Sequence, residues 1–354
     1  MAIRSLLNLG EFSRVNHRMH NKCLIIDNQA AIVGGRNQAD EYFGWHEAAN
    51  FRDLELICFG KVVPQISQCF DRFWNDDWTY PEDFVADEDA IEEYPEGYEA
   101  WVSIHTKRFL HEAAEARQAA WHALAERAFD AKIQILADLP ANEQDGHFES
   151  EGAKVLEQEL IELIDQAQSE LIMVSAYLIP TDELTAAIAR AEQRGVEVKI
   201  LTNSMRSNNH LAAHSAYRHH SRQLVELGAD LHEVHVYAKD RNLYMEPPVD
   251  TKHLGLHGKF LLIDNNYSII GSANLDPRSL ILNTELNLAI ESTELNAQLR
   301  EYIRVDFDQR NAWHLIIKED GQLYWISDEE ELTSQPAHSG LQRIENWILS
   351  VMPI

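Results

Sequence analysis

The feature that most constrains this chain is a sequence pattern that occurs twice. The pattern His-x-Lys-x4-Asp, then six residues, then Gly-[Gly/Ser]-x-Asn spans residues 20–37 and again residues 257–274. Its polar and small positions are His20, Lys22, Asp27, Gly35 and Asn37 in the first copy, and His257, Lys259, Asp264, Ser272 and Asn274 in the second. Two copies this far apart indicate duplicated halves rather than a solenoid of short repeats.

The correspondence continues downstream of each copy. The segment "RDLELI" follows the first copy and "TELNLAI" follows the second, which aligns Asp53 with Glu285. A lone His-x-Lys-x4-Asp arises by chance on many strands, whereas two copies with matching Gly-x-x-Asn tails are specific. The pair therefore predicts a site built from both halves.

Length and composition limit the class of protein. The 354 residues leave room for two domains with sizeable cores. We find no apolar stretch long enough to span a bilayer and no signal-peptide pattern. The three cysteines lack metal-ligand spacing and suggest a reducing compartment. The net charge of -28 disfavours nucleic acid, although a local basic patch on an acidic chain can still bind it.

The second half alternates between helical and strand-like segments. Buried strands that alternate with amphipathic helices predict an α/β domain with a largely parallel sheet. Thr181 is the expected N-cap of one helix, and Gly195 follows its end. The expected strands are 131–140, 170–179, 196–202 and 229–237, and the expected helices are 152–168, 181–195 and 208–228.

We predict three parts: a first lobe over 1–80, an acidic and helical connection over 81–130, and a second lobe over 131–354. Residues 81–100 carry nine acidic and no basic residues, typical of a solvated connection, and 105–130 has helical spacing. Only 19 residues precede the first motif. The first lobe is therefore expected to lack its opening βαβα segment, either because the chain is a fragment or because the lobe lost those strands naturally.

Each motif is expected to form a β-hairpin. With a two-residue turn at 28–29, Asp27 faces Ala30, and counting back pairs Lys22 with Gly35 and His20 with Asn37. The same count through 265–266 pairs Lys259 with Ser272 and His257 with Asn274. Opposed residues share a face, so the imidazole, ammonium and amide are expected to meet at the open end of each hairpin. Asp27 and Asp264 lie an odd number of residues from the motif lysines, so their side chains are expected on the opposite face. We interpret them as supporting, turn-capping groups.

The residue types indicate phosphoryl chemistry. Cations and neutral donors on one face suit a phosphate. Two histidines suit a nucleophile and an acid, because an imidazole titrates near neutral pH. Asp53 and Glu285 are the expected carboxylates that orient the imidazoles through their other nitrogens. Two lysines supply positive charge, so the prediction includes no metal and no cofactor.

These motifs resemble the phospholipase D superfamily, whose hallmark is a duplicated His-Lys-Asp motif. The stretches "RMHNK", "VGGRN", "YFG", "LTNS" and "GSANLDPRSLILNTE" resemble bacterial cardiolipin synthases, especially the C-type subgroup. The resemblance implies a bilobal α/β fold of two pseudo-twofold-related mixed β-sheets flanked by helices, with the active site between the lobes. By position, His20 matches the family's nucleophile and His257 its general acid.

The resemblance also implies partners. It predicts a phosphatidyltransferase with a phosphohistidine intermediate, whose substrate is a phospholipid: phosphatidylglycerol, with phosphatidylethanolamine as a further candidate. It places the protein at the cytoplasmic side of the cell membrane, in peripheral contact with it, and does not predict a nucleic-acid partner. Alternatives are a phospholipase D or nuclease-type phosphodiesterase of the same fold, and an inactive truncated lipid-binding fragment. The oligomeric state is not predicted.

Four further residues are candidates for substrate binding. Tyr177 follows an expected strand, where ligands of open α/β sheets bind, although a core aromatic is the alternative. His214 and Arg218 are expected either to line the groove or to lie on the surface. Arg278 either pairs with Glu285 or touches phosphate. His210 and His214 have metal-binding i, i+4 spacing, but no third ligand accompanies them.

Overall fold

The structure is a computed structural model that describes residues 17–77, 79–81, 120, 123–140, 151–245 and 247–350. The chain divides into two compact units, one formed by residues 1–69 and 131–354 and the other by residues 70–130. Both motifs belong to the first unit. The acidic stretch 81–100 and the expected helix 105–130 lie almost entirely outside the described residues. The division into three parts stays a prediction.

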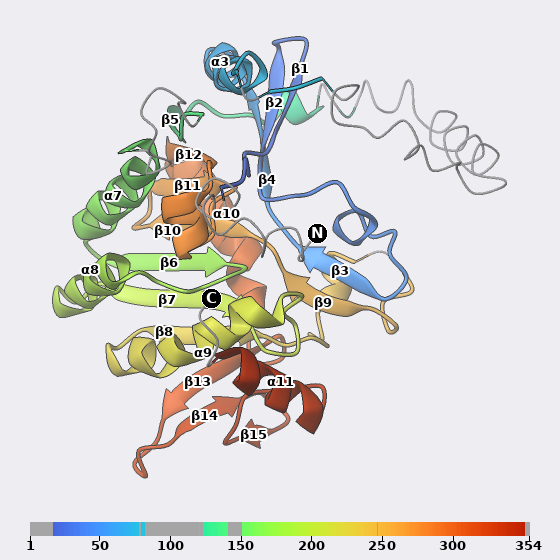
Figure 1. Cartoon of the computed structure of the whole chain (residues 1–354), viewed down its shortest axis with the longest axis vertical. Helices are drawn as coiled ribbons and strands as arrows, with labels where there is room; N and C mark the ends of the chain where they lie inside the picture. The colour runs from blue at the N-terminus through green and yellow to red at the C-terminus, as the bar shows by residue number, and fades with distance from the viewer. Residues whose placement is uncertain are drawn as a thin grey trace. The chain divides into compact units, whose positions relative to one another are not determined.

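A ten-stranded mixed sheet dominates the first unit (Figure 1). Its strand order is β15-β14-β13-β8-β7-β6-β10-β11-β12-β5. Strands β6, β7 and β8 run parallel, and the other neighbours are antiparallel. The strands are β5 (Lys132–Ala137), β6 (Glu170–Ser175), β7 (Glu197–Asn203), β8 (Asp230–Val234), β10 (Lys259–Ile263), β11 (Tyr267–Gly271), β12 (Leu286–Glu291), β13 (Ala312–Ile317), β14 (Leu323–Ile326) and β15 (Glu331–Leu332).

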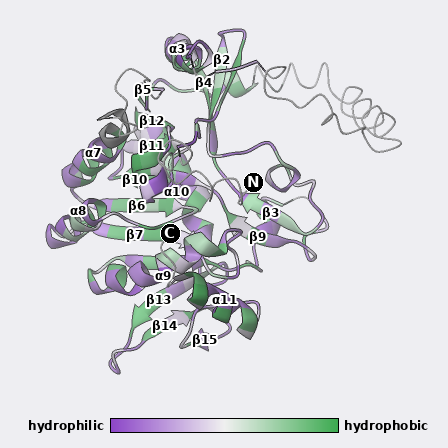
Figure 2. Ribbon diagram, in the orientation of Figure 1, coloured by the Kyte–Doolittle hydropathy of each residue, from purple (hydrophilic) through white to green (hydrophobic). Residues whose placement is uncertain are grey.

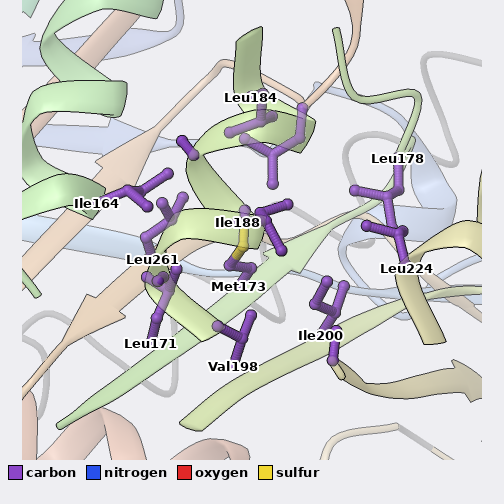
Figure 3. Close-up of a cluster of buried hydrophobic side chains, with 14 of the residues drawn as sticks. Ile164, Leu171, Met173, Leu178, Leu184, Ile188, Val198, Ile200, Leu224 and Leu261 are labelled. Carbon is purple, nitrogen blue, oxygen red and sulfur yellow. The ribbon is translucent and has the colours of Figure 1, made fainter. Parts of the chain in front are cut away.

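Helices cover this sheet and bury its apolar side chains. The helices of the second half are α7 (Glu151–Gln166), α8 (Asp182–Gln193), α9 (Leu211–Glu226), α10 (Thr293–Arg304) and α11 (Gly340–Ser350). Ile164 and Ile188 from the helices lie in one cluster with Met173 and Ile200 from the parallel strands (Figure 3). Strands β6 and β7 are hydrophobic along most of their length, whereas α7 and α8 carry both kinds of residue (Figure 2). This pattern buries one face of each helix.

The expected helices and strands of the second half are confirmed, with small changes at their ends. The expectation of a largely parallel sheet is wrong, because among the described strands of the ten-stranded sheet only the pairs β6–β7 and β7–β8 are parallel, and the other neighbours, hairpins among them, are antiparallel. Helix α8 begins after Thr181, whose side-chain oxygen accepts a hydrogen bond from the Leu184 N–H at 3.1 Å. It ends before Gly195, which has a φ of 81°. Both are ordinary stop and start signals of a helix.

The first half repeats part of the second. Its sheet contains β1 (Cys23–Ile26), β2 (Ala30–Gly34) and β4 (Glu55–Phe59), followed by α3 (Val62–Trp74). This order matches β10, β11, β12 and α10. Strand β2 contacts β11 and β12, so the two motif hairpins pack against each other. The described end of α3 that belongs to residues 70–130 carries a stacked pair of rings, Phe70 and Trp74.

Short elements connect the motifs to the rest of the chain. Strand β3 (Ala49–Arg52) pairs in parallel with β9 (His253–Leu256), joining a segment of the first half to one of the second. The remaining turns are η1 (Asp40–Tyr42), η4 (Arg241–Leu243), η5 (Arg278–Leu282) and η6 (Val305–Phe307).

The predicted register of both hairpins is wrong by one residue. Ile26 pairs with Ala30, and Ile263 pairs with Tyr267, so each turn has three residues instead of two. The cause is the backbone of Asp27 and Asp264, which both have a φ of 50° and so belong to the turn. Short polar residues tolerate this left-handed conformation.

The carboxylate of Asp264 has a structural role. It accepts hydrogen bonds from the backbone N–H groups of Gln168, Ser169 and Glu170, at 2.7–3.2 Å. The second motif's turn is thereby fixed to the start of β6. This geometry supports the interpretation of Asp264 as a supporting group, and the same role for Asp27 stays a prediction.

Candidate active site

Each motif histidine is held by backbone from the opposite half of the chain. The N–H of His20 donates to the Thr284 carbonyl at 2.9 Å, and the N–H of His257 donates to the Arg52 carbonyl at 2.8 Å. Thr284 directly precedes Glu285, and Arg52 directly precedes Asp53. These two backbone hydrogen bonds are equivalent in the two halves. Each one places an imidazole beside the carboxylate of the other half.

The two carboxylates bind the imidazoles crosswise. His20 Nδ1 lies 2.9 Å from both oxygens of Glu285, and His257 Nδ1 lies 2.7 Å from Asp53 Oδ2. Both carboxylate side chains are fully buried. A carboxylate on Nδ1 fixes the ring orientation and leaves Nε2 for chemistry. The sequence predicted these carboxylates, but not that each one serves the histidine of the other half.

The two lysines lie beside the histidines. Lys22 Nζ donates to the His20 carbonyl at 2.9 Å, and Lys259 Nζ donates to the His257 carbonyl at 2.6 Å. Burial lowers the pKa of each lysine to about 8, and the negative charges of Glu285 and Asp53 partly oppose this. Both lysines are therefore mainly charged at neutral pH but poorly solvated. Such cations are strong partners for an incoming anion.

The two histidines differ in their surroundings. The His20 side chain is 28% exposed, whereas that of His257 is 5% exposed. Burial lowers the pKa of His257 to about 4, and the neighbouring Lys259 adds to this effect, while Asp53 opposes it. His257 is therefore uncharged in the free protein at neutral pH.

The small residues of the motifs make room for the carboxylates. A side chain at Gly35 would place its Cβ 2.7 Å from Asp53 Oδ1, so the close approach requires glycine. The matching residue Ser272 instead donates its hydroxyl to Glu285 Oε2 at 2.5 Å. The equivalent positions 35 and 272 therefore both accommodate a carboxylate. Gly35 does so because it has no side chain, and Ser272 does so by donating a hydrogen bond.

The two motif asparagines have different surroundings. Asn37 donates to the Tyr42 hydroxyl at 2.9 Å, and the Tyr42 ring packs edge-on against His257 at 4.9 Å. Asn274 is buried, and its Oδ1 atom has no hydrogen-bond partner among the described residues. The hydrogen bonds and ring contacts of the site therefore join the two histidines, the two lysines, the two carboxylates and, through Tyr42, Asn37, while the chemical roles of all eight residues stay predictions.

The four substrate-binding candidates have different surroundings. The Tyr177 hydroxyl donates to Asn209 at 3.0 Å. His214 is completely buried at the contact of α9 with α11, where it bonds to Asn346 at 3.3 Å and burial lowers its pKa to about 4. Packing between helices therefore accounts for His214, and Arg218 is half-buried one turn further along α9.

Arg278 is exposed at the start of η5. The Glu285 carboxylate is engaged by His20 and Ser272, and both alternatives for Arg278, an ion pair with Glu285 or a contact with phosphate, stay predictions. Among the described residues, no contact joins His214 or Arg218 to the motif histidines.

Arg52 is a positioning residue that the sequence analysis missed. Its guanidinium lies between the rings of Tyr244 and Tyr302, at 4.1 and 3.7 Å, and donates to Asp306 at 2.9 Å. The Tyr302 hydroxyl also donates to the Asp53 carbonyl at 3.3 Å. Arg52 thus fixes the backbone that holds both Asp53 and His257. The only signal in the sequence is a basic residue directly before the aligned carboxylate.

Asp138 was also missed. Its carboxylate accepts a hydrogen bond from the Glu285 N–H at 2.8 Å, and its own N–H donates to the Glu285 carbonyl at 3.1 Å. Burial raises the pKa of Asp138 to about 7, the nearby Glu285 charge adds to this, and the backbone hydrogen bond opposes it. An acidic residue at the end of an expected strand was the available signal.

A cavity of about 320 Å³ adjoins the site. Asp53 forms part of its wall, together with Arg36, Tyr42, Phe51, Arg52 and Tyr302. The cavity therefore backs onto the carboxylate that holds His257, and its lining is aromatic and cationic. Such a mixture suits an anionic or polyol group attached to an apolar molecule.

A separate cluster has metal-ligating atoms. In the described part of the chain, Asp230, His232 and His314 bring one ligand atom each within 4.8 Å of one another. Both imidazoles already hydrogen bond to Asp230 Oδ1, at 2.9 and 3.0 Å. The Nδ1 atom of buried His232 has no acceptor among the described residues, unlike the usual metal-bound histidine. We interpret the cluster as structural.

Comparisons with known proteins agree with this fold and site. Residues 160–307 match the family described as cardiolipin synthase, PLD-like domain. Cardiolipin synthase C of Escherichia coli is 30% identical over 99% of this chain and 76% of its own length. An uncharacterized protein of Helicobacter pylori is 26% identical over 96% of the chain and 67% of its own length.

A solved structure has the same fold. The phosphatidylserine synthase of Haemophilus influenzae superposes with a TM-score of 0.56 at 16% identity, covering 84% of this chain. The chain spans 63% of that protein's length. The chain belongs to the phospholipase D superfamily and is an enzyme of that type. Cardiolipin synthase C of E. coli is one of the relatives that match almost the whole of this chain. None of the described helices combines the length and hydropathy needed to cross a membrane.

Proposed function

We propose that this protein is a phosphatidyltransferase of the cardiolipin synthase type, which acts on phospholipid phosphodiesters through a phosphohistidine. One observation carries the proposal: two imidazoles, each oriented by a buried carboxylate of the other half, share a site with two lysines, of which Lys259 is buried and Lys22 half-buried. The resemblance to cardiolipin synthase C supports phospholipids as substrates.

The reaction has two steps. His20 Nε2 attacks phosphorus, the bond from phosphorus to the leaving alcohol breaks, and His257 gives its Nε2 proton to the leaving oxygen. The hydroxyl of a second lipid then gives its proton to His257 and bonds to phosphorus, which breaks the bond from phosphorus to His20. With phosphatidylglycerol as donor and acceptor, the products are cardiolipin and glycerol. Water as acceptor gives phosphatidic acid.

Charge balance explains how His257 acquires its proton. Two lysines and two carboxylates leave the free site close to neutral, and the lowered pKa of His257 keeps that ring uncharged. A bound phosphodiester adds one negative charge, which favours the imidazolium form. Proton uptake by His257 thus accompanies substrate binding. His20 is the nucleophile in this scheme because it matches that position of the family and is the more accessible ring.

A phosphodiesterase that acts on nucleic acid is the alternative within the same fold. The net charge of -28 argues against it, because nucleic acid attracts basic surfaces. An inactive lipid-binding form would bind phospholipid without turnover. We further propose that the protein contacts the membrane peripherally.

A product assay tests the proposal. The protein would be incubated with labelled phosphatidylglycerol, with and without phosphatidylethanolamine, in excess chelator. We expect cardiolipin from the parent protein and from a control variant, His219→Ala, which changes an exposed histidine of α9. We expect none from His20→Ala or His257→Ala. Phosphatidic acid alone would indicate a phospholipase, and a folded protein without turnover would contradict the proposal.

A further inference from the structure

An aromatic turn stands next to the proposed active site. The segment that leads from β2 to β3 contains "YFGW" at residues 42–45 (Figure 1). Tyr42 is buried against His257, but Phe43 is 50% exposed and Trp45 is 67% exposed. Buried and exposed aromatic residues thus follow each other within four positions. The exposed pair has no role in the mechanism proposed above.

The structure holds this turn in place. The N–H groups of Trp45 and His46 donate to the Asp40 carbonyl at 3.0 and 3.2 Å. Lys252 Nζ donates to the Gly44 carbonyl at 2.7 Å, and Gly44 has a φ of 76°, which permits the turn. The two aromatic side chains are therefore presented by an ordered backbone, so their burial by a partner costs little ordering.

A third exposed apolar side chain is the sequence neighbour of another residue that lines the same cavity. Phe43 and Gly44 line the 320 Å³ cavity, and so does Tyr244. Leu243, directly before Tyr244, is 67% exposed. We call Phe43, Trp45 and Leu243 the apolar rim. Phe43 itself lines the cavity, and Trp45 and Leu243 directly follow or precede the lining residues Gly44 and Tyr244. The wall of the cavity also includes Asp53, the carboxylate that holds His257.

We propose that the apolar rim enters the interfacial layer of a phospholipid bilayer and places the cavity over the lipid headgroups. This inference rests on the proposed function. The cavity argues for a bilayer over a protein partner, because the proposed substrate is a phospholipid and Phe43 shares the cavity lining with Asp53. Tryptophan, phenylalanine and leucine are also the side chains that favour the membrane interface.

The negative charge of the protein limits which interactions can bind it to the bilayer. The chain carries a net charge of -28, and Asp40, Glu41 and Glu47 flank the turn. Attraction to anionic lipids is therefore a poor source of affinity. Insertion of the apolar rim into the bilayer is then the main source of affinity. Because this interaction is not screened by ions, high salt should not weaken vesicle binding.

The test measures vesicle binding directly. Full-length parent protein and the double variant Trp45→Ser/Leu243→Ser would be sedimented with vesicles of equal parts phosphatidylethanolamine and phosphatidylglycerol, at low and high salt. We expect the partition coefficient of the double variant to fall by at least about tenfold. The matched control is Trp347→Ser, which removes another exposed tryptophan, from α11, and should bind as the parent does.

A second readout separates the rim from the chemistry. We would measure the turnover rate with phosphatidylglycerol in vesicles and with a short-chain phosphatidylglycerol that stays monomeric in solution. The ratio of the vesicle rate to the monomer rate should fall in the double variant. If the parent binds vesicles but turns over neither substrate, the proposed function fails while the rim proposal stands. Unchanged binding by the double variant, an equal loss in Trp347→Ser, or loss of parent binding at high salt would each overturn the rim proposal.

Discussion

Replacing Arg52 by methionine tests whether the buried ion pair between Arg52 and Asp306 stabilises the protein and positions the site. In the structure the Arg52 guanidinium is buried, pairs with buried Asp306 at 2.9 Å and lies between two tyrosine rings. Methionine fills similar space but leaves the Asp306 carboxylate without its cation. Removing one partner of a buried ion pair costs about 3–5 kcal/mol of unfolding free energy.

The pH dependence of this loss has a definite sign. Burial already raises the pKa of Asp306, although Arg52 opposes the effect. Without Arg52 the pKa rises further, and a carboxyl whose folded pKa exceeds its unfolded pKa destabilises the protein above the unfolded value, near 4. The penalty of Arg52→Met should therefore be full above the raised pKa of Asp306 and shrink as the pH falls from that pKa toward about 4.

Urea unfolding of parent and variant, followed by tryptophan fluorescence at several pH values, measures both effects. The control is the double variant Arg52→Met/Asp306→Leu, which removes both charges and should recover most of the lost stability. Turnover should stay low in both variants if Arg52 also positions Asp53. A loss of stability that is independent of pH, or that the double variant does not relieve, would refute this reasoning.

Three further predictions concern the site itself. Asp53→Asn should lower turnover by about 10²–10⁴-fold, because Asp53 orients the His257 ring, and steady-state kinetics of the variant beside the parent checks this. Gly35→Ala should lower turnover because its Cβ would meet the Asp53 carboxylate, and circular dichroism would show whether the fold is kept. Phosphate affinity, measured by calorimetry, should fall as the pH rises through about 8, because burial lowers the pKa of both motif lysines to that value and they then lose their charge.

Much of the fold could be predicted because it depends on local patterns. Strand and helix periodicity located the elements of the second half, and the duplicated spacing located both hairpins. The register failed by one residue because Asp27 and Asp264 adopt a left-handed backbone, which spacing alone does not reveal.

The site was predicted in its residues but not in its connections. Alignment of the two copies identified Asp53 and Glu285, yet it gave no reason to exchange them between halves. The exchange depends on the backbone hydrogen bonds from His20 to Thr284 and from His257 to Arg52, which span most of the chain. The pairing of Arg52 with Asp306 is equally distant in sequence and carries no periodic signal.

The most direct test of the account is to locate the covalent intermediate. The protein would be mixed briefly with labelled phosphatidylglycerol, quenched in denaturant at alkaline pH, where phosphohistidine survives, and mapped by mass spectrometry. The account predicts a phosphatidyl group on His20, absent from His20→Ala and not formed on any other residue. A modification on His257, or cardiolipin formation without any labelled histidine, would contradict it.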